Sequence, residues 1–284
     1  GGSSGAEGSG ALRGEGTITE GKTGLFGLGC ARWADGVTIS DPRTLGGAGL
    51  GVDVREGHLE HAESAERTQV GLRVLVGARQ ACMAVSDTRP DTLRQIAQQA
   101  VALARNAPVD DSVGLATPDQ ITQNTDARAL ELYDPNPSPT PEYSQDMALR
   151  AEAAAQGKGI SQVQGTSAGY TRSHVVIRMS NGFAADYERS THSLSCAAIV
   201  GEGTGMERDY CAEARVFAAD MPTAESIGRT AAQRALARSG AVRPKTGHWP
   251  VVFDKRIASS LMGHLMTAIN GAAIVRGASW ALDL

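Results

Sequence analysis

Apolar and polar residues alternate at Val52 and Val54 and again over residues 70–76 and 81–85, which is the period-2 pattern of strands with one buried face. A first strand ends at a turn formed by Glu56 and Gly57. Residues 77–80 then connect two further strands into an antiparallel hairpin. The side chains predicted on the apolar face are Val52, Val54, Val70, Leu72, Val74, Val76, Ala81, Met83 and Val85.

A helix is predicted to cover this apolar face. Thr88 is followed by Pro90 and Asp91, a combination that is typical of a helix start. Strands with a covering helix define an α+β domain over residues 51–116. The apolar stripe of the helix consists of Leu93, Ile96, Ala97, Ala100, Val101 and Ala104.

A linker separates this domain from a second one. Residues 117–141 end in YDPNPSPTP, whose prolines disfavour helix and remove backbone donors. We therefore expect an extended, semi-rigid connection. Residues 142–242 form the second domain, and they begin with a segment that is helical by composition.

The second domain is predicted to be rich in strands. Asn181 and Gly182, between HVVIRMS and FAADYERS, give the strongest short hairpin signal in the chain. Further strand-like segments follow at LSCAAIVGEG and YCAEARVFA. A closing helix is predicted over residues 222–239, with Pro222 in its first turn and Gly240 after its end.

The last part of the chain is predicted to hold a strand, WPVVFD, followed by a buried helix from Lys255. Asn270 and Gly271 are expected to end or bend this helix, because both tolerate left-handed backbone geometry. Arg276 is either a solvated charge or a partner for carbonyls at the helix end. The apolar face predicted to be buried consists of Ile257, Leu261, Leu265, Ala268 and Ala272.

The start of the chain gives no such pattern. Nearly half of the 34 glycines lie in the first 51 residues, where large apolar residues are few. Residues 1–50 are therefore predicted to be poorly ordered. We hypothesise that residues 1–48 arise from a wrong start or a shifted reading frame. Translation of the other frames tests this, since one of them should give an amphipathic helix joined to VDVREG.

Composition excludes several classes of function. A formal net charge of −4 and 20% charged residues give no bulk electrostatic signal for nucleic-acid or anionic-membrane binding. No stretch of about 18 apolar residues is present, so no membrane span is predicted. The four cysteines form no CxxC pair, which favours reduced thiols in a cytoplasmic protein. They are Cys30, Cys82, Cys196 and Cys211.

Three short groups could carry chemistry, and each has a structural alternative. His58 and His61 have a spacing found in metal pairs, but in an extended chain they point to opposite faces. GEGTG, residues 201–205, lacks the lysine of a phosphate loop and is better explained as a turn between strands. Ser260 and His264 share a helix face, yet a serine there more often bonds a carbonyl one turn back.

From about Gly51 onward the chain resembles the TldD/PmbA family, specifically its PmbA (TldE) branch. The resemblance is most specific at GLRVLVGARQA, SQVQGTSAGY, GEGTGMERDY and the closing helix with its INGAAIVRGAS run. In the TldD branch this helix carries an HExxxH zinc motif. The resemblance places Met262 and Thr267 at the two histidines and Gly263 at the glutamate. None of these residues supplies a good zinc ligand or a general base, and His264 falls where no ligand is expected.

The resemblance implies the metal-free subunit of a cytoplasmic peptidase complex. Zinc is expected in a TldD-type partner, no cofactor in this chain, and small unfolded peptides as substrate. The glycine-rich turn would line the peptide cleft, and the possible peptide or partner contacts are Gly203, Thr204, Gly205, Glu207 and Arg208. Family members continue into a further β-rich domain, so residues 243–284 are expected to be the start of a truncated third domain. Two alternatives remain open: an autonomous hydrolase, and a regulatory factor that binds gyrase or another protein.

Overall fold

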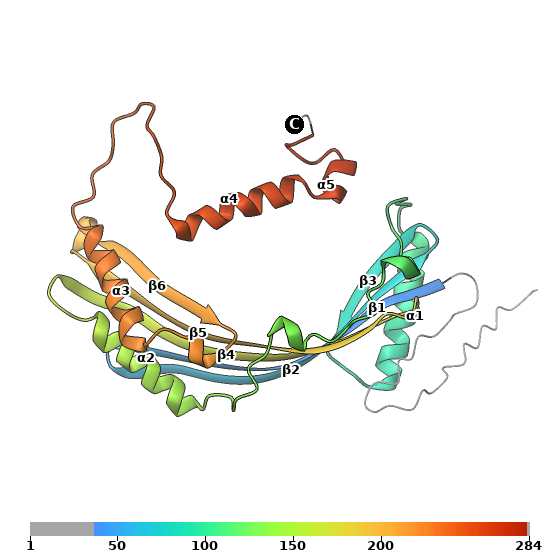
Figure 1. The fold of residues 1–284 in the computed structure, drawn as a ribbon, viewed down its shortest axis with the longest axis horizontal. Helices are drawn as coiled ribbons and strands as arrows, with labels where there is room; N and C mark the ends of the chain where they lie inside the picture. Colours follow the sequence, from blue (N-terminus) through green and yellow to red (C-terminus); the bar gives the residue numbers. More distant parts are fainter. Residues whose placement is uncertain (1–36, 283–284) are drawn as a thin grey trace, which may run out of the picture. The chain divides into compact units, whose positions relative to one another are not determined.

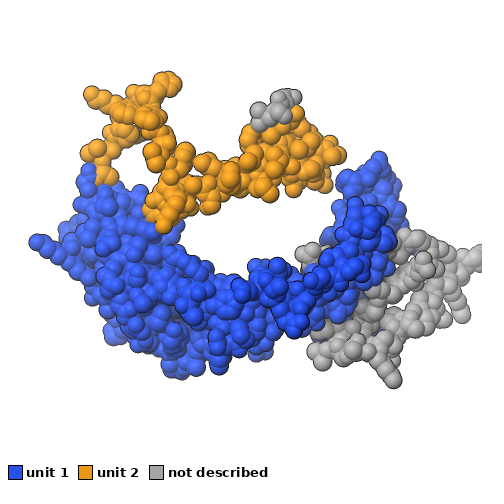
Figure 2. Space-filling view, in the orientation of Figure 1, with its two compact units in different colours: residues 1–240 blue, residues 241–284 orange. Residues whose placement is uncertain are grey.

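A computed structural model of the chain describes residues 37–282. It contains two compact units, Gly1–Gly240 and Ala241–Leu284 (Figure 2). The first unit is built on one antiparallel sheet with the strand order β3-β2-β1-β4-β5-β6 (Figure 1). Its strands are β1 Val37–Arg55, β2 His58–Val76, β3 Arg79–Val85, β4 Ile160–Met179, β5 Ala184–Val200 and β6 Glu207–Arg215.

Among the described residues, three α-helices belong to the first unit and two to the second. The helices α1 (Pro90–Asn106), α2 (Pro141–Ala155) and α3 (Ala224–Ala237) pack on the sheet, α2 and α3 side by side at one end and α1 at the other (Figure 1). The second unit holds α4 (Lys255–Ala268) and α5 (Gly271–Val275). No helix among the described residues has the length and apolar character needed to cross a membrane.

All three helices of the first unit lie on the same face of the sheet. Val52 packs under α2 and α3, and it pairs directly with Ala62 of β2. Directly opposed residues share a face, and every second residue of a strand returns to it. Ala62 therefore shares its face with Leu72 and Val74, which pack under α1. We call this the covered face, and the other one the open face.

The structure confirms an α+β fold of antiparallel strands with covering helices. The turn at Glu56 and Gly57 and the hairpin at Asn181 and Gly182 form where the sequence predicted them. The predicted stripe of α1 is also confirmed, since five of its six residues are buried and Ile96 packs against them.

The prediction of poor order was wrong for residues 37–50, which lie in β1. Neighbouring strands on both sides, β2 and β4, satisfy the backbone of β1 and compensate for its low apolar content. Pro42 falls at a register shift between Ser40 and Arg43, where a strand tolerates a missing donor. Residues 1–36 lie outside the described residues. Because β1 joins β2 to β4, the segments 51–116 and 142–242 contribute to one sheet.

Three details of the predicted elements were also wrong. Pro222 does not lie in the first turn of α3, because Thr223 caps that helix by accepting a hydrogen bond from the Ser226 backbone N–H. WPVVFD forms no strand. The third detail is the reason given for the end of α4: the helix ends before Asn270, as predicted, but Asn270 is extended rather than left-handed, and its side chain caps α5 by accepting from the Ala273 N–H.

The apolar stripe of α4 is largely exposed, which also differs from the prediction. Ile257, Leu261 and Leu265 are 55%, 45% and 41% exposed, and only Ala268 of the stripe is buried. Ser279 Oγ donates to the Ala268 carbonyl at 2.6 Å, so the described packing of α4 lies at its C-terminal end. The apolar side of a helix is buried only when a second layer of structure packs against it. The helices α4 and α5 of this short unit do not form such a layer.

Candidate functional site

The open face of the sheet is lined by small side chains. One row runs across five strands, from Glu63 through Gly51, Gly169 and Ser193 to Ala214. The rows on either side of it have the same character. They are Asp53, Ser167, Ser195 and Ala212 on one side, and Ala65, Gly49, Thr171 and Thr191 on the other. The hydroxyls donate and accept hydrogen bonds, and the small side chains let a ligand backbone approach closely.

Two glycines of β1, Gly49 and Gly51, leave open space on this face, whereas a Cβ atom at Gly47 would lie 2.8 Å from the Arg172 carbonyl oxygen. A Cβ atom at Gly51 would meet nothing within 4 Å, and one at Gly49 would meet only the Ala65 carbonyl oxygen at 4.0 Å. Packing within the described chain therefore does not demand glycine at these positions. Gly169 differs, because a Cβ there would lie 2.8 Å from Ser193 Oγ.

Two arginines converge at one end of the open face. Arg55 Nε donates to the Gln164 carbonyl at 3.1 Å, and Arg208 Nη1 donates to Gln164 Oε1 at 3.0 Å. Gln164 lies at a register shift of β4, which moves its backbone out of the regular ladder. Glu60 pairs with Arg55 at 3.4 Å. These residues line a hollow of about 510 Å³ together with Asp53, Ser167, Ser195 and Tyr210.

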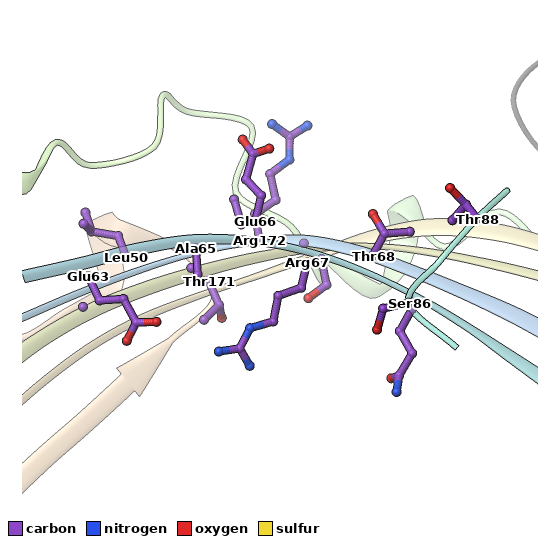
Figure 3. Close-up of a pocket in the computed structure, with 16 residues that line it drawn as sticks. Leu50, Glu63, Ala65, Glu66, Arg67, Thr68, Ser86, Thr88, Thr171 and Arg172 are labelled. Carbon is purple, nitrogen blue, oxygen red and sulfur yellow. The ribbon is translucent and has the colours of Figure 1, made fainter. Parts of the chain in front are cut away.

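A larger hollow of about 960 Å³ lies at the middle of the sheet. Figure 3 shows Glu63, Arg67 and Thr171 directed to one side of the strands and Glu66 and Arg172 to the other. The first three belong to the open face. Volumes of a few hundred Å³ suit small ligands and short peptide segments.

The glycine-rich turn lies where the sequence predicted it, between two strands. Gly203, Thr204 and Gly205 form a short 3₁₀ turn, η3, and all three are exposed. The residues after it point to different faces. Glu207 is directed to the covered face and pairs with Arg238 of α3 at 3.5 Å, whereas Arg208 is on the open face.

Of the five predicted contact residues, Arg208 therefore lines the open face and Glu207 has a structural partner in α3. Sequence reasoning missed Arg55 and Gln164. The pairing of Arg55 and Arg208 around one residue depends on a strand irregularity, and no local pattern predicts it.

Two hydroxyls of α4 are engaged with carbonyls of their own helix. Thr267 Oγ1 donates to the Gly263 carbonyl at 2.9 Å, and Ser260 Oγ donates to the Ile257 carbonyl at 2.6 Å. The second bond is the alternative predicted for Ser260 in place of catalysis. Met262 and His264 are exposed. Within the described residues, no group of three or more His, Cys, Asp or Glu side chains is placed to hold a metal ion.

A buried carboxylate, Asp134, connects the linker to the covered face. Its oxygens accept from the Ala218 N–H at 2.9 Å and from the Asn136 N–H at 3.0 Å, and His192 Nε2 lies 3.4 Å away. The hydrogen bond from Ala218 is the main reason that the pKa of Asp134 lies below its ordinary value. The His192 ring packs 4.8 Å from that of Tyr170. Because its partners, two backbone N–H groups and the side chains of Asn136 and His192, tie the linker to the sheet and to the chain after β6, Asp134 is a structural anchor.

Cys82, Cys196 and Cys211 are not joined in disulfides. Cys196 and Cys211 are buried and pair directly across β5 and β6, while Cys82 is exposed. Burial raises the pKa of the Cys196 thiol, which disfavours the nucleophilic thiolate.

His58 and His61 lie in β2, in extended chain. The prediction that they point to opposite faces was wrong: they pair directly with Arg55 and Asp53, which share the open face, because the register shift between Asp53 and Val54 adds a residue to β2 between them.

Two family models match this chain. The PmbA/TldA metallopeptidase central domain matches residues 134–239, and PmbA/TldA metallopeptidase domain 1 matches residues 46–104. Together they cover more than half of the sequence. The chain belongs to the PmbA/TldD family. The match to domain 1 begins within β1, before the position at which the sequence resemblance was expected to start.

Curated relatives in this family are named PmbA. The chain is 29% identical over 253 residues to the metalloprotease PmbA of Escherichia coli O157:H7, covering 88% of this chain and 55% of that protein. It is 27% identical over 242 residues to the PmbA homolog of Haemophilus influenzae, covering 83% and 52%. The chain therefore spans about half the length of the relatives it matches.

Solved structures of the family share the fold. A protein from Bacteroides thetaiotaomicron, assigned as a modulator of DNA gyrase, aligns with a TM-score of 0.78 at 23% identity, covering 88% of this chain and 57% of that one. TldE from Thermococcus kodakarensis aligns with a TM-score of 0.64 at 16% identity, covering 87% and 55%. The names of the curated relatives agree with the PmbA/TldE branch predicted from the sequence.

Proposed function

We propose that this chain is a metal-free, PmbA/TldE-type subunit that binds peptide and acts with a TldD-type metallopeptidase partner. Zinc would be held by the partner, and this chain would contribute a binding surface for an unfolded peptide. We place the complex in the cytoplasm, which accords with the free thiols of Cys82, Cys196 and Cys211.

The chemistry of α4 carries the metal-free part of the proposal. Where the TldD-type motif would have two histidines and a glutamate, this chain has Met262, Thr267 and Gly263. The Thr267 hydroxyl is engaged with its own helix, and a thioether is a weak zinc ligand. Zinc sites need three or four nitrogen, oxygen or sulfur ligands, so these residues do not fit the ion.

The open face supports the peptide-binding part. Its rows of glycine, serine, threonine and alanine allow an extended backbone to lie close to the strands and to bond hydroxyl groups. Arg55 and Arg208 at one end supply positive charge that would suit a peptide carboxylate. The contacts they make with Gln164 fix both guanidinium groups before a ligand arrives.

Reconstitution with a TldD-type partner tests this proposal. The chain alone, the partner alone and the mixture are compared for cleavage of an unstructured peptide. We expect cleavage to require the partner and to rise when this chain is added. Cleavage by this chain alone would contradict the proposal and favour an autonomous hydrolase.

A regulatory role is distinguished by co-purification. The Bacteroides relative is described as a modulator of DNA gyrase, so a protein-binding function is the second candidate. Retention of gyrase without a TldD-type subunit would favour that candidate. Retention of a TldD-type subunit without gyrase is the result that we expect.

A further inference from the structure

Within residues 37–282, no strand pairs with the outer edge of β2 along most of its length. β3 pairs with β2 only from Val70 to Val76, whereas β2 begins at His58. Residues 58–69 therefore pair with β1 on one side and face solvent on the other. Among the hydrogen bonds of the described residues, none from another segment reaches this outer backbone. An unpaired edge of this length is a template for another strand.

Other edges of the same sheet are partly occupied. The Ser190 N–H of β5 donates to the Leu132 carbonyl of the linker at 3.0 Å. On β6, Arg234 of α3 donates to the Tyr210 carbonyl at 3.0 Å. The fold thus supplies partners for these two edges. The edge of β2 lacks an equivalent partner in the described chain.

The charges along this edge are arranged to complement a second copy of the same edge. An antiparallel pair with a two-fold axis at Ala65 would place Glu63 opposite Arg67 of the second copy, and Arg67 opposite Glu63 of the second copy. Glu63 and Arg67 lie on the same side of the strand, as Figure 3 shows, so opposed side chains would meet on one face. Glu66 points to the other side and would oppose Ser64 of the second copy.

Neighbouring registers are less favourable. In such a dimer the two-fold axis is perpendicular to the sheet, so each residue is opposed by a residue of the second copy whose side chain lies on the same face. The possible registers therefore differ by moving the axis one residue along β2. An axis at Glu63 would oppose Glu63 with itself, which is repulsive. An axis at Ser64 would oppose His61 with Arg67 and form no opposite-charge pair between carboxylates and arginines.

We propose that residues 58–69 of β2 form a homotypic interface, in which two copies of this chain pair edge to edge around Ala65. This interface does not depend on the TldD-type partner. Backbone hydrogen bonds would supply affinity, and the two Glu63–Arg67 pairs would select the register. The same charges would discourage pairing with unrelated strands.

Cysteine crosslinking tests the register. In the proposed dimer the two Ala65 Cα atoms are directly opposed, within the range of a disulfide. Ala65→Cys should give a crosslinked dimer under mild oxidation. Thr68→Cys is the matched control, because Thr68 would oppose Ala62 and lie far from its own copy. Crosslinking no greater than in the unmodified chain, or equal crosslinking at both positions, would overturn the proposal.

Charge reversal tests the same interface without cysteine. Glu63→Arg alone and Arg67→Glu alone each place like charges opposite one another. Each should therefore raise the dissociation constant of the dimer by about tenfold, as measured by sedimentation in the analytical ultracentrifuge. The double variant restores both pairs in reversed order and should recover the original dissociation constant. A chain that is monomeric at every concentration, or a double variant as weak as the single ones, would refute the interface.

Discussion

At the scale of single residues, Asp134 is the group whose ionisation is most closely tied to the fold. It is buried and accepts hydrogen bonds from Ala218 and Asn136, which lowers its pKa. A lowered pKa in the folded state means that the contribution to stability is present above the unfolded pKa, about 3.9, and is lost as the pH falls through the folded value.

We expect Asp134→Asn to lose about 1–3 kcal/mol at pH 7, because the replacement removes charge-assisted acceptors in a buried site. The difference from the unmodified chain should shrink as the pH falls below about 4. Urea unfolding between neutral and acidic pH measures both quantities. A difference that stays constant across this range would show that ionisation of Asp134 does not stabilise the fold.

Gly228 is the residue that sets the distance between α2 and α3. A Cβ atom here would overlap the Ala151 carbonyl oxygen of α2. Gly228→Ala should therefore destabilise the first unit by about 1–3 kcal/mol, despite the better helix propensity of alanine. Thermal unfolding measures this change. Gly263→Ala in α4 is the control, since a Cβ there meets nothing within 4 Å and should cause no loss.

At the scale of elements, the strand that lines the open face can be tested directly. Gly51→Val adds a side chain to an open position of β1 without a clash, so the stability should change by less than about 0.5 kcal/mol. Binding of an unstructured peptide should fall by about tenfold, because the new side chain lies on the proposed surface. Fluorescence titration measures the affinity.

Ala48→Val is the matched control for this change. Ala48 is exposed on the same strand but points to the opposite side. Peptide affinity should be unchanged by it. Equal loss in both variants would mean that peptide binding does not depend on the open face.

Prediction from sequence succeeded for elements whose own residues determine them. The Asn181–Gly182 turn and the α1 stripe are local signals, and both elements form as predicted. β1 could not be predicted in its first half, because its glycine-rich chain is ordered by the neighbouring strands β2 and β4. The outer half of β2 was missed for a similar reason, since its charged residues give no apolar alternation.

The candidate site was predicted only in part. The degenerate α4 positions follow from residue chemistry alone, and Arg208 was identified from the segment around it. The open face itself depends on register between strands distant in sequence, such as Gly51 with Gly169. Composition of one strand does not reveal which residues its neighbours place beside it.

At the scale of the whole molecule, the connection after α3 is the expected site of proteolysis. Residues 241–254 are exposed and contain no helix or strand. Limited trypsin digestion should cut first after Lys245, because exposed irregular chain fits a protease most readily and the bond after Arg243 is protected by Pro244. Mass spectrometry identifies the fragments. First cuts within the strands of the sheet would contradict the division into two compact units.

The central claim is that this chain contributes binding and no metal to a peptidase complex. The most direct test is the zinc content, measured by elemental mass spectrometry. It is measured on the chain purified alone and on its complex with a TldD-type partner. We predict zinc in the complex and none above background in the chain alone, since Met262, Gly263 and Thr267 do not provide ligands. Stoichiometric zinc in the chain alone would contradict the account.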